Sequence, residues 1–471
     1  MTSVAGSFSV VLRCAGCAAT VDPSDASVRS PFQCPNAKRA PNIDHILAWD
    51  PVSAGVTGWP TDNSTNPFIR YRTLQNSYWV GRSLGGTDTD HLALVDRLDR
   101  AIAAIDGTGF RVTPLVPADA VSEALGVDVW TKNDTHNVAG SHKARHLMGL
   151  LLHLELRRVS NRTPLAIASC GNAAFAAATL GKASKRPVHV HIPEGANPVV
   201  VEMLRARSAQ LTVCPRLDSD PPGDPCLHRF HEALSRGELP FCVQGSENGL
   251  TIDGGATIGH ELADQLAMLG LPVDRIFVQV GGGALGSALF QGLRDALALG
   301  VLTAMPKFHC VQSEGCAPLA LAWERVAMRA LRSLDNESLF DEGHGAVALA
   351  LSDPLAKPAV EEALLYAATH RSQFMAPFDG TLTSIAGGII DDETYDWMAL
   401  LRATFATGGW PIVASEDALA EANRLACSGP DPADADETGT ASLAGALMAR
   451  RNGDLMEGER IVTLITGIRR R

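Results

Sequence analysis

Lys143 is the residue whose position most suggests chemistry. It follows the polar turn Gly140-Ser141-His142 and begins an apolar helical run that ends near Arg158. The positive end of a helix dipole disfavours a cation at this position. Burial and such a helix end both lower a lysine pKa, and a neutral amine can then bond a carbonyl carbon. Because most lysines are solvated surface residues, Lys143 alone leaves both alternatives open.

A second turn, SCGN at 169–172, follows the apolar stretch LAIA. Gly171 allows a ligand to approach the backbone closely, and Asn172 offers both a donor and an acceptor. A tight turn with an asparagine at a helix start is the simpler alternative. Ligands of open parallel sheets bind beyond the carboxyl ends of the strands, so this turn is a candidate binding turn.

Consecutive glycines form a third turn after the stretch RIFVQV, with the sequence Gly281-Gly282-Gly283-Ala284-Leu285-Gly286. Its free backbone N–H groups could cradle a phosphate at the start of the next helix. A fourth turn, Thr466-Gly467, follows the last predicted strand, where its hydroxyl could meet a ring nitrogen. Each of these turns is weak alone.

The glycine turn also fits the dinucleotide fingerprint G-x-G-x-x-G, with Glu314 as the acid that would bind the ribose. This alternative predicts a nicotinamide or flavin enzyme. Glu314 lies 28 residues beyond Gly286, which is long for that contact. The turn also comes late in the chain and leaves Lys143 without a role, so this alternative is remote.

The turns lie in a chain that alternates predicted strands and helices. Strands are predicted at VDVWTKN, LAIA, RPVHVHI, AQLTVCP, DRIFVQV, KFHCVQSE and ERIVTLITG, with helical stretches between them. Such alternation implies crossover connections, a mostly parallel sheet and helices on both faces, which is the α/β class.

We expect a ribbon-like extension at 1–50, an arm and the start of a large domain at 51–130, a small mobile domain at 131–220, and the rest of the large domain at 221–471 with a helical insertion at about 320–375. Within the extension, Cys14, Cys17 and Cys34 form three quarters of a zinc ribbon. Ala37 stands where the spacing expects a fourth ligand, which His45 or Asp44 could replace. A metal-free ribbon is the favoured interpretation.

Bulk composition excludes several classes of protein. The chain has 471 residues, 46% of them hydrophobic, and a net charge of −12, which favours a globular protein and argues against a nucleic-acid or anionic-membrane partner. Met1 to Gly16 lacks the pattern of a signal peptide. The sequence has no stretch of about 18 uninterrupted apolar residues, so no membrane span is predicted. Ten cysteines are spread thinly, so we expect a cytoplasmic location.

Taken in order, the lysine, asparagine, glycine and threonine turns resemble those of the pyridoxal-phosphate enzymes of the tryptophan synthase β fold, or fold type II, and most of all threonine synthase and its relatives. Similar stretches include TPLVPADAVSEALGVDVWTKNDTHNVAGSHKAR, SCGNAAFAAA, GGATIGHELADQL, GTASLAGAL and GERIVTLITG. They cover about residues 110–320 and 370–470, and the cysteine-rich start resembles the ribbon of some threonine synthases. The resemblance implies two open, mostly parallel sheets, pyridoxal 5'-phosphate as cofactor, and a homodimer or larger assembly.

The resemblance also implies roles for the matching residues. Lys143 would form the internal aldimine and then act as acid and base at the α- and β-carbons. Asn172 would bond the ring hydroxyl of the cofactor, and Thr466 would face its pyridine nitrogen. The cofactor phosphate would lie on Gly281, Gly282, Gly283, Ala284 and Leu285. The substrate carboxylate would lie on Ser169, Cys170 and Gly171.

Two neighbours of Lys143 depart from the threonine synthase pattern. His142 replaces the usual phenylalanine, and tryptophan synthase β chains have a histidine there, beside the phosphate. His142 is therefore a candidate phosphate or proton partner, or else a helix-start histidine bonded to backbone. Ala144 replaces the usual aspartate, which weakens a phosphohomoserine assignment, whereas Arg145 keeps the Lys-x-Arg pattern. The nearby histidines are interpreted as structural; they are His136, His146 and His153.

The expected function is a pyridoxal-phosphate-dependent elimination or replacement at the β- or γ-carbon of an amino acid, in the manner of threonine synthase. A serine/threonine-type ammonia-lyase is an alternative that the sequence does not separate from it. A protein that holds the cofactor without turnover is a further alternative.

Overall fold

The computed structural model describes residues 8–25, 27, 31–221, 223–378, 382–428 and 432–470. Residues 1–7, 26 and 28–30 belong to the extension predicted at 1–50, and residues 1–7 also belong to the segment Met1 to Gly16, for which no signal peptide is predicted. For these residues, the predicted extension and the predicted absence of a signal peptide lie outside the described part of the chain.

A six-stranded sheet forms the larger of two α/β units, and its strand order is β12-β11-β10-β13-β5-β4. Neighbouring strands are parallel except for β4 and β5. The strands are β4 (Leu115–Pro117), β5 (Asp128–Asn133), β10 (Arg275–Gln279), β11 (Lys307–Ser313), β12 (Ile412–Ala414) and β13 (Arg460–Ile465). Every residue of β10 is buried, which requires cover on both faces of the sheet, as predicted for the α/β class.

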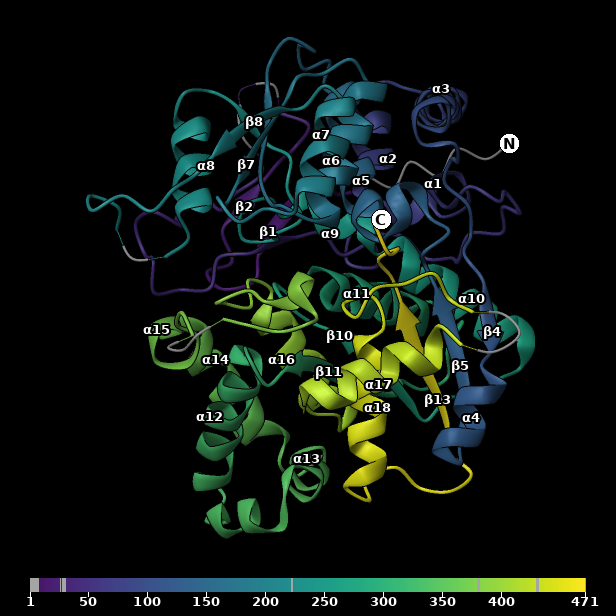
Figure 1. Ribbon diagram of the computed structural model, residues 1–471, viewed down its shortest axis with the longest axis vertical. Coiled ribbons are helices and arrows are strands. Elements are labelled where there is room, and N and C mark those ends of the chain that lie inside the picture. The colour runs from purple at the N-terminus through teal and green to yellow at the C-terminus, as the bar shows by residue number, and fades with distance from the viewer. Residues whose placement is uncertain are drawn as a thin grey trace.

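A smaller sheet of four parallel strands has the order β8-β7-β6-β9. It consists of β6 (Leu165–Ala168), β7 (Val188–Ile192), β8 (Gln210–Val213) and β9 (Leu239–Pro240). Figure 1 shows β7 and β8 in the upper part of the molecule and the larger sheet below them. Because Leu239 pairs with Leu165, this unit continues to Pro240, and the predicted boundary at 220 is too early.

The N-terminal extension contains a small antiparallel sheet of order β2-β1-β3. Its strands are β1 (Leu12–Cys14), β2 (Thr20–Val21) and β3 (Leu47–Ala48). Cys14 thus ends a strand, and His45 lies just before another strand that pairs with it. These pairings lie within the extension predicted at 1–50.

Helices occupy most of the remaining described chain. They are α1 (Pro67–Arg70), α2 (Asn76–Ser83), α3 (Asp88–Asp106), α4 (Asp119–Leu125), α5 (Lys143–Leu156), α6 (Asn172–Ala183), α7 (Pro198–Ala206), α8 (Pro225–Ser235), α9 (Leu250–Gly255), α10 (Thr257–Leu269), α11 (Ala284–Ala298), α12 (Pro318–Arg332), α13 (His344–Leu351), α14 (Lys357–Thr369), α15 (Arg371–Phe374), α16 (Trp397–Thr407), α17 (Glu416–Ala426) and α18 (Ala441–Arg451), with 3-10 turns η1 (Arg72–Leu74), η2 (Val138–Gly140), η3 (Glu337–Glu342) and η4 (Gly387–Ile389). Within the described ranges, none of these helices is long and apolar enough to span a bilayer.

Local sequence explains where several of these helices begin. Thr87 and Asp90 form a reciprocal capping box at the start of α3, and Asp224 caps α8 immediately before Pro225. The helices that matter for the candidate site, α5, α6 and α11, instead follow the turns singled out in the sequence. Their N-terminal backbone N–H groups therefore lie at the strand ends where ligands of such sheets bind.

Candidate active site

The lysine turn is held in an unusual backbone conformation. Ala139 and Gly140, which end η2, have φ values of 59° and 65°, in the left-handed region. A side chain at Gly140 would collide with Ile468, whose backbone N–H donates to the Gly140 carbonyl oxygen at 2.9 Å. The end of the chain therefore packs directly on this turn, and glycine is needed because the two segments touch.

Lys143 is the first residue of α5 and is partly buried. Desolvation lowers the pKa of its ammonium group, while the carboxylates of Asp391 and Asp396 oppose that change. Its place at the positive end of the helix also favours the neutral amine. These properties support the interpretation of Lys143 as a reactive amine rather than a solvated surface residue.

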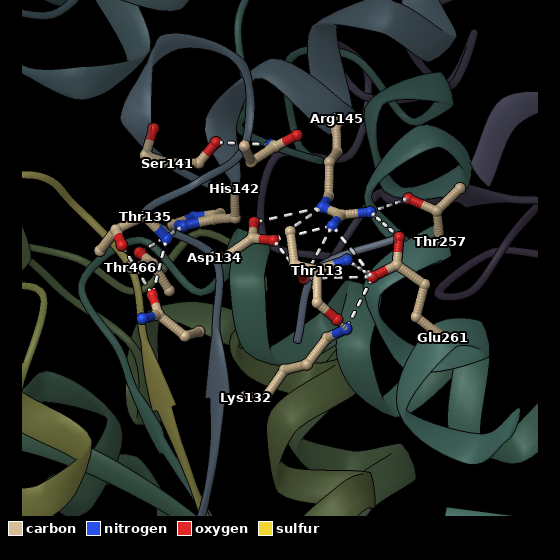
Figure 2. A network of polar contacts seen from close by, with 12 residues as sticks. Thr113, Lys132, Asp134, Thr135, Ser141, His142, Arg145, Thr257, Glu261 and Thr466 are labelled. Atoms are coloured by element: carbon tan, nitrogen blue, oxygen red, sulfur yellow. Dashed lines mark hydrogen bonds and ion pairs between the residues drawn. The ribbon is translucent and has the colours of Figure 1, made fainter. Parts of the chain in front are cut away.

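A buried ionic network fixes the first turn of α5, and Figure 2 shows its members. Arg145, which is fully buried, donates to Asp134 at 2.7 Å and to Glu261 of α10 at 2.6 Å. Glu261 also accepts from the equally buried Lys132 of β5 at 2.7 Å. The network joins α5, α10 and the large sheet. Because Arg145 lies two residues after Lys143, its ion pairs fix the position of the helical turn that carries Lys143.

The asparagine turn follows β6, and Asn172 begins α6. Its Oδ1 accepts two hydrogen bonds from Arg470, from Nε at 3.1 Å and from Nη2 at 2.8 Å. Arg470 also stacks on Phe175, 3.9 Å from the ring centroid, and burial lowers its pKa to about 10. Because its oxygen accepts from Arg470, the amide N–H groups of Asn172 are the donors left for a ligand. Arg470 is not among the site residues predicted from the sequence.

The glycine turn joins β10 to α11, and Gly283 has a φ of 97° that favours glycine. A segment at 389–396 lies against this turn. A Cβ on Gly281 would come within 2.5 Å of Asp391 Oδ2, and one on Gly282 within 2.7 Å of the Tyr395 ring. Side chains at these glycines would therefore collide with the 389–396 segment, so glycine is what allows the two segments to pack together.

Asp391 and Asp396 are acidic residues of this segment that sequence reasoning missed. Burial raises the pKa of Asp391 to about 6, against the opposing charge of Lys143 and a hydrogen bond from the Gly282 N–H. Burial also raises the pKa of Asp396 to about 8, and the charge of Asp44 raises it further. The signal available in the sequence was the run IIDDETYDW, which places four acids after a glycine pair.

Thr466 follows β13 and lies beside the lysine turn. Its Oγ1 shares a 2.8 Å hydrogen bond with Nδ1 of His142. Burial, together with the charge of Lys143, lowers the pKa of His142 well below its usual value, so the ring is neutral. His142 is thus bonded to a side chain rather than to backbone, and Gly467 lies next to Asn172.

The fold and these four turns define the class of protein. The glycine turn follows β10, and the lysine and asparagine turns lead into α5 and α6. The threonine turn contacts the lysine turn through His142 and the asparagine turn through Asn172. Residues 108–338 match the sequence profile of the family described as pyridoxal-phosphate dependent enzyme. The predicted fold type II architecture and its cofactor are thereby confirmed.

The similar curated proteins carry two kinds of name. A threonine synthase of Methanosarcina acetivorans is 30% identical over 214 residues, which are 45% of this chain and 49% of the relative. A serine dehydratase-like protein of Mus musculus is 28% identical over 185 residues, which are 39% of this chain and 53% of the relative. The chain thus spans about half the length of the curated relatives it matches.

A solved structure, the processed form of threonine deaminase isoform 2 from Solanum lycopersicum, has the same fold. Its TM-score is 0.55 at 16% identity, with 82% of this chain and 91% of that chain covered. At this identity the likeness supports the arrangement of strands and helices and nothing finer.

The residues at the site fit pyridoxal phosphate. Its aldehyde needs an amine that can lose its proton, and Lys143 has a lowered pKa. Its phosphate needs backbone donors at a helix start, and the turn that ends at Gly283 leads directly into α11, whose N-terminal N–H groups have no side-chain cap. Its ring hydroxyl and nitrogen need polar partners, which the Asn172 amide and the Thr466 hydroxyl would supply.

Proposed function

We propose that this protein catalyses a pyridoxal-phosphate-dependent elimination or replacement on an amino acid. The observation that carries the proposal is Lys143, a partly buried amine of lowered pKa at the first position of α5. When bound, the cofactor supplies an electron sink for the α-carbon of the substrate. Lys143 holds the cofactor and moves protons at the substrate carbons.

The other residues bind and orient in this proposal. The Asn172 amide and the Thr466 hydroxyl hold the ring, and Gly281 to Leu285 hold the phosphate. Ser169, Cys170 and Gly171 bind the substrate carboxylate through the turn that precedes α6. His142 acts on Thr466, with which it shares a hydrogen bond, and thereby orients the hydroxyl that faces the ring nitrogen.

Acidic groups around the substrate turn favour elimination over a reaction of a phosphorylated substrate. Desolvation raises the pKa of the Cys170 thiol, and the charges of Asp224 and Asp391 raise it further. Asp392 lies near the same acidic residues: burial raises its pKa, and the charges of Glu393 and Asp224 raise it further. Such a negative field repels a phosphate leaving group, whereas it attracts a cationic group and does not repel a neutral one. We therefore favour an ammonia-lyase acting on an amino acid with a hydroxyl or amino group at the β-carbon.

The dinucleotide alternative finds no support at Glu314. Its carboxylate accepts the backbone N–H of Glu416 at 3.0 Å at the start of α17. The acid that would bind a ribose is thus engaged with a helix terminus.

A substrate screen of the protein loaded with pyridoxal phosphate tests the proposal. We expect keto acid and ammonia from amino acids with a β-hydroxyl or β-amino group, and no phosphate from O-phosphohomoserine. Phosphate release from the phosphorylated substrate alone would overturn the preference for elimination. Bound cofactor without turnover of any candidate would instead favour a cofactor-holding protein.

Arg470→Ala is expected to weaken cofactor binding by about tenfold, because the Asn172 amide loses the two charge-assisted bonds that orient it. Arg470→Lys is expected to weaken it nearly as much, since lysine cannot make a two-pronged bond. Absorbance titration with pyridoxal phosphate measures both affinities.

Arg207→Ala is the matched control for this prediction. Arg207 stacks on the same Phe175 ring at 3.8 Å, but it is Arg470 that bonds Asn172. Equal losses of affinity in Arg207→Ala and Arg470→Ala would show that the stacking, and not the bond to Asn172, holds the site.

Asp391→Asn is expected to remove an ionisation near pH 6 from the pH profile of kcat/KM. The pKa of Asp391 is raised to about 6, so its carboxylate is charged above that pH and neutral below it. Attraction of a cationic substrate is therefore present at high pH and lost as the pH falls through about 6. At pH 8 the variant should raise KM for such a substrate by about tenfold or more.

Asp353→Asn provides the control, because it removes the same charge from an exposed turn where asparagine can still accept the Leu355 N–H. If Asp391→Asn keeps the ionisation near pH 6, the assignment of that ionisation to Asp391 is wrong.

The cytoplasmic location and the homodimer or larger assembly stay predictions.

A further inference from the structure

Four ligand-type side chains converge in the N-terminal extension, away from Lys143. Sγ of Cys14, Cys17 and Cys34 and a ring nitrogen of His45 all lie within 4.8 Å of one another. Cys17 Sγ is 3.5 Å from Cys34 Sγ, and Cys14 Sγ is 3.4 Å from His45 Nδ1. In a tetrahedral zinc site, Zn–S bonds of about 2.3 Å and Zn–N bonds of about 2.0–2.1 Å put ligand atoms roughly 3.5–3.8 Å apart. These four atoms therefore match the spacing of a zinc site.

The backbone around the first two cysteines is built to bring them together. Cys14 ends β1, and the Ala18 N–H donates to the Cys14 carbonyl oxygen at 3.0 Å in a turn where Ala18 has a φ of 60°. A side chain at Gly16 would collide with the carbonyl oxygen of Asp44. The Cys-x-x-Cys turn thus packs tightly against the chain that carries His45.

Asn36 donates hydrogen bonds to the sulfur atoms of two of the cysteines, Cys34 and Cys17. The Asn36 N–H donates to Cys34 Sγ at 3.4 Å, and the Asn36 side chain donates to Cys17 Sγ at 3.5 Å. Donors aimed at sulfur stabilise the thiolate form that a metal requires. A cluster of neutral thiols gains less from these donors.

His45 is oriented as a metal ligand by its other nitrogen. Its Nε2 lies 3.1 Å from the carbonyl oxygen of Ala40, an acceptor that needs a proton on that nitrogen. Nδ1 then carries the lone pair and faces Cys14 Sγ. A carbonyl behind the ring is the usual partner that fixes the tautomer of a metal-bound histidine.

We propose that Cys14, Cys17, Cys34 and His45 bind one Zn²⁺ ion in a closed tetrahedral site. The metal-free ribbon favoured by the sequence rested on Ala37, which stands at the position expected for a fourth cysteine. The pairing of β3 with β1 instead brings His45 to that corner of the cluster. Four protein ligands leave no open position for a substrate, so the ion is structural.

The proposed zinc also fixes a contact with the candidate active site. Asp44, next to His45, accepts a hydrogen bond from Trp397 Nε1 at 2.9 Å and donates its backbone N–H to Ala368 at 2.8 Å. Trp397 follows Asp396, whose side chain lies against Gly283 and Gly245. The ion would therefore hold the extension against α14 and α16 and support the segment that covers the glycine turn.

Metal analysis of the full chain, purified with pyridoxal phosphate and with zinc supplied, tests this proposal. We expect about one zinc per chain in the wild type and in Cys427→Ser, a control cysteine outside the cluster, and less than about a tenth of that in His45→Ala. His45→Cys should keep the zinc, because a fourth thiolate replaces the imidazole. Wild type without zinc, or zinc retained by His45→Ala, would overturn the proposal.

Cobalt provides a test that does not depend on the folding of variants. Wild-type protein stripped of metal by a chelator is titrated with Co²⁺. We expect the visible bands of a tetrahedral cobalt site together with sulfur-to-metal charge transfer, reaching a plateau at one equivalent. A disulfide between Cys17 and Cys34 in freshly purified protein, or a cobalt spectrum without these bands, would overturn the site.

Discussion

Replacing Lys143 with alanine is expected to lower the elimination rate by at least about 10²–10⁴-fold, the contribution of a positioned acid–base group. The variant should also lack the visible absorbance band of lysine-bound pyridoxal phosphate. The physical reason is that the amine at the start of α5 has two roles, holding the cofactor aldehyde and transferring the substrate proton. Its lowered pKa makes the neutral form available for both.

Borohydride reduction identifies the lysine without relying on activity. Reduction of the loaded wild type, followed by digestion and mass spectrometry, should place the cofactor on the peptide that contains Lys143. Lys357→Ala is the control, because its side chain is 73% exposed and lies in α14. Cofactor fixed to a different lysine, such as the buried Lys132, would contradict the assignment.

Much of the fold was predictable because its signals are local. Apolar runs bounded by glycine turns mark parallel strands, and β10 and β13 lie where RIFVQV and ERIVTLITG predicted them. The order of the lysine, asparagine, glycine and threonine turns predicted the family. Each of these features depends on residues that are close together in the sequence.

The contacts that sequence reasoning missed join distant parts of the chain. Arg470 bonds Asn172 although the two residues are 298 positions apart in the sequence. Asp391 and Asp396, whose charges raise the pKa of Lys143 against the effect of burial, come from a segment with no catalytic motif. The boundary at 220 was misplaced for the same reason, since the pairing of β9 with β6 is not visible in either strand alone. Hydrophobic periodicity predicts elements, but the pairing of polar side chains depends on the assembled fold.

Arg145→Met is expected to destabilise the protein by about 3–5 kcal/mol, measured as the free energy of unfolding in a denaturant titration. Arg145 is fully buried and neutralises Asp134 and Glu261, so its loss leaves Asp134 as a buried carboxylate without its cation. Restoring neutrality in the double variant Arg145→Met/Asp134→Asn should recover part of the loss. Arg205→Met, which breaks an exposed pair with Glu202, should cost less than about 1 kcal/mol.

The pH dependence of the same variant tests whether charge is the cause. Burial acts to raise the pKa of Glu261, but the charges of Arg145 and Lys132 outweigh it and hold the pKa below the usual 4.5. The stabilisation from such a depressed carboxyl is present above its unfolded pKa and is lost as the pH falls through the folded pKa. Without Arg145 the Glu261 carboxyl protonates more readily, so the stability difference between wild type and Arg145→Met should narrow as the pH falls towards 4.5. A difference that stays constant from pH 8 to this range would instead assign the effect to lost packing of the arginine side chain.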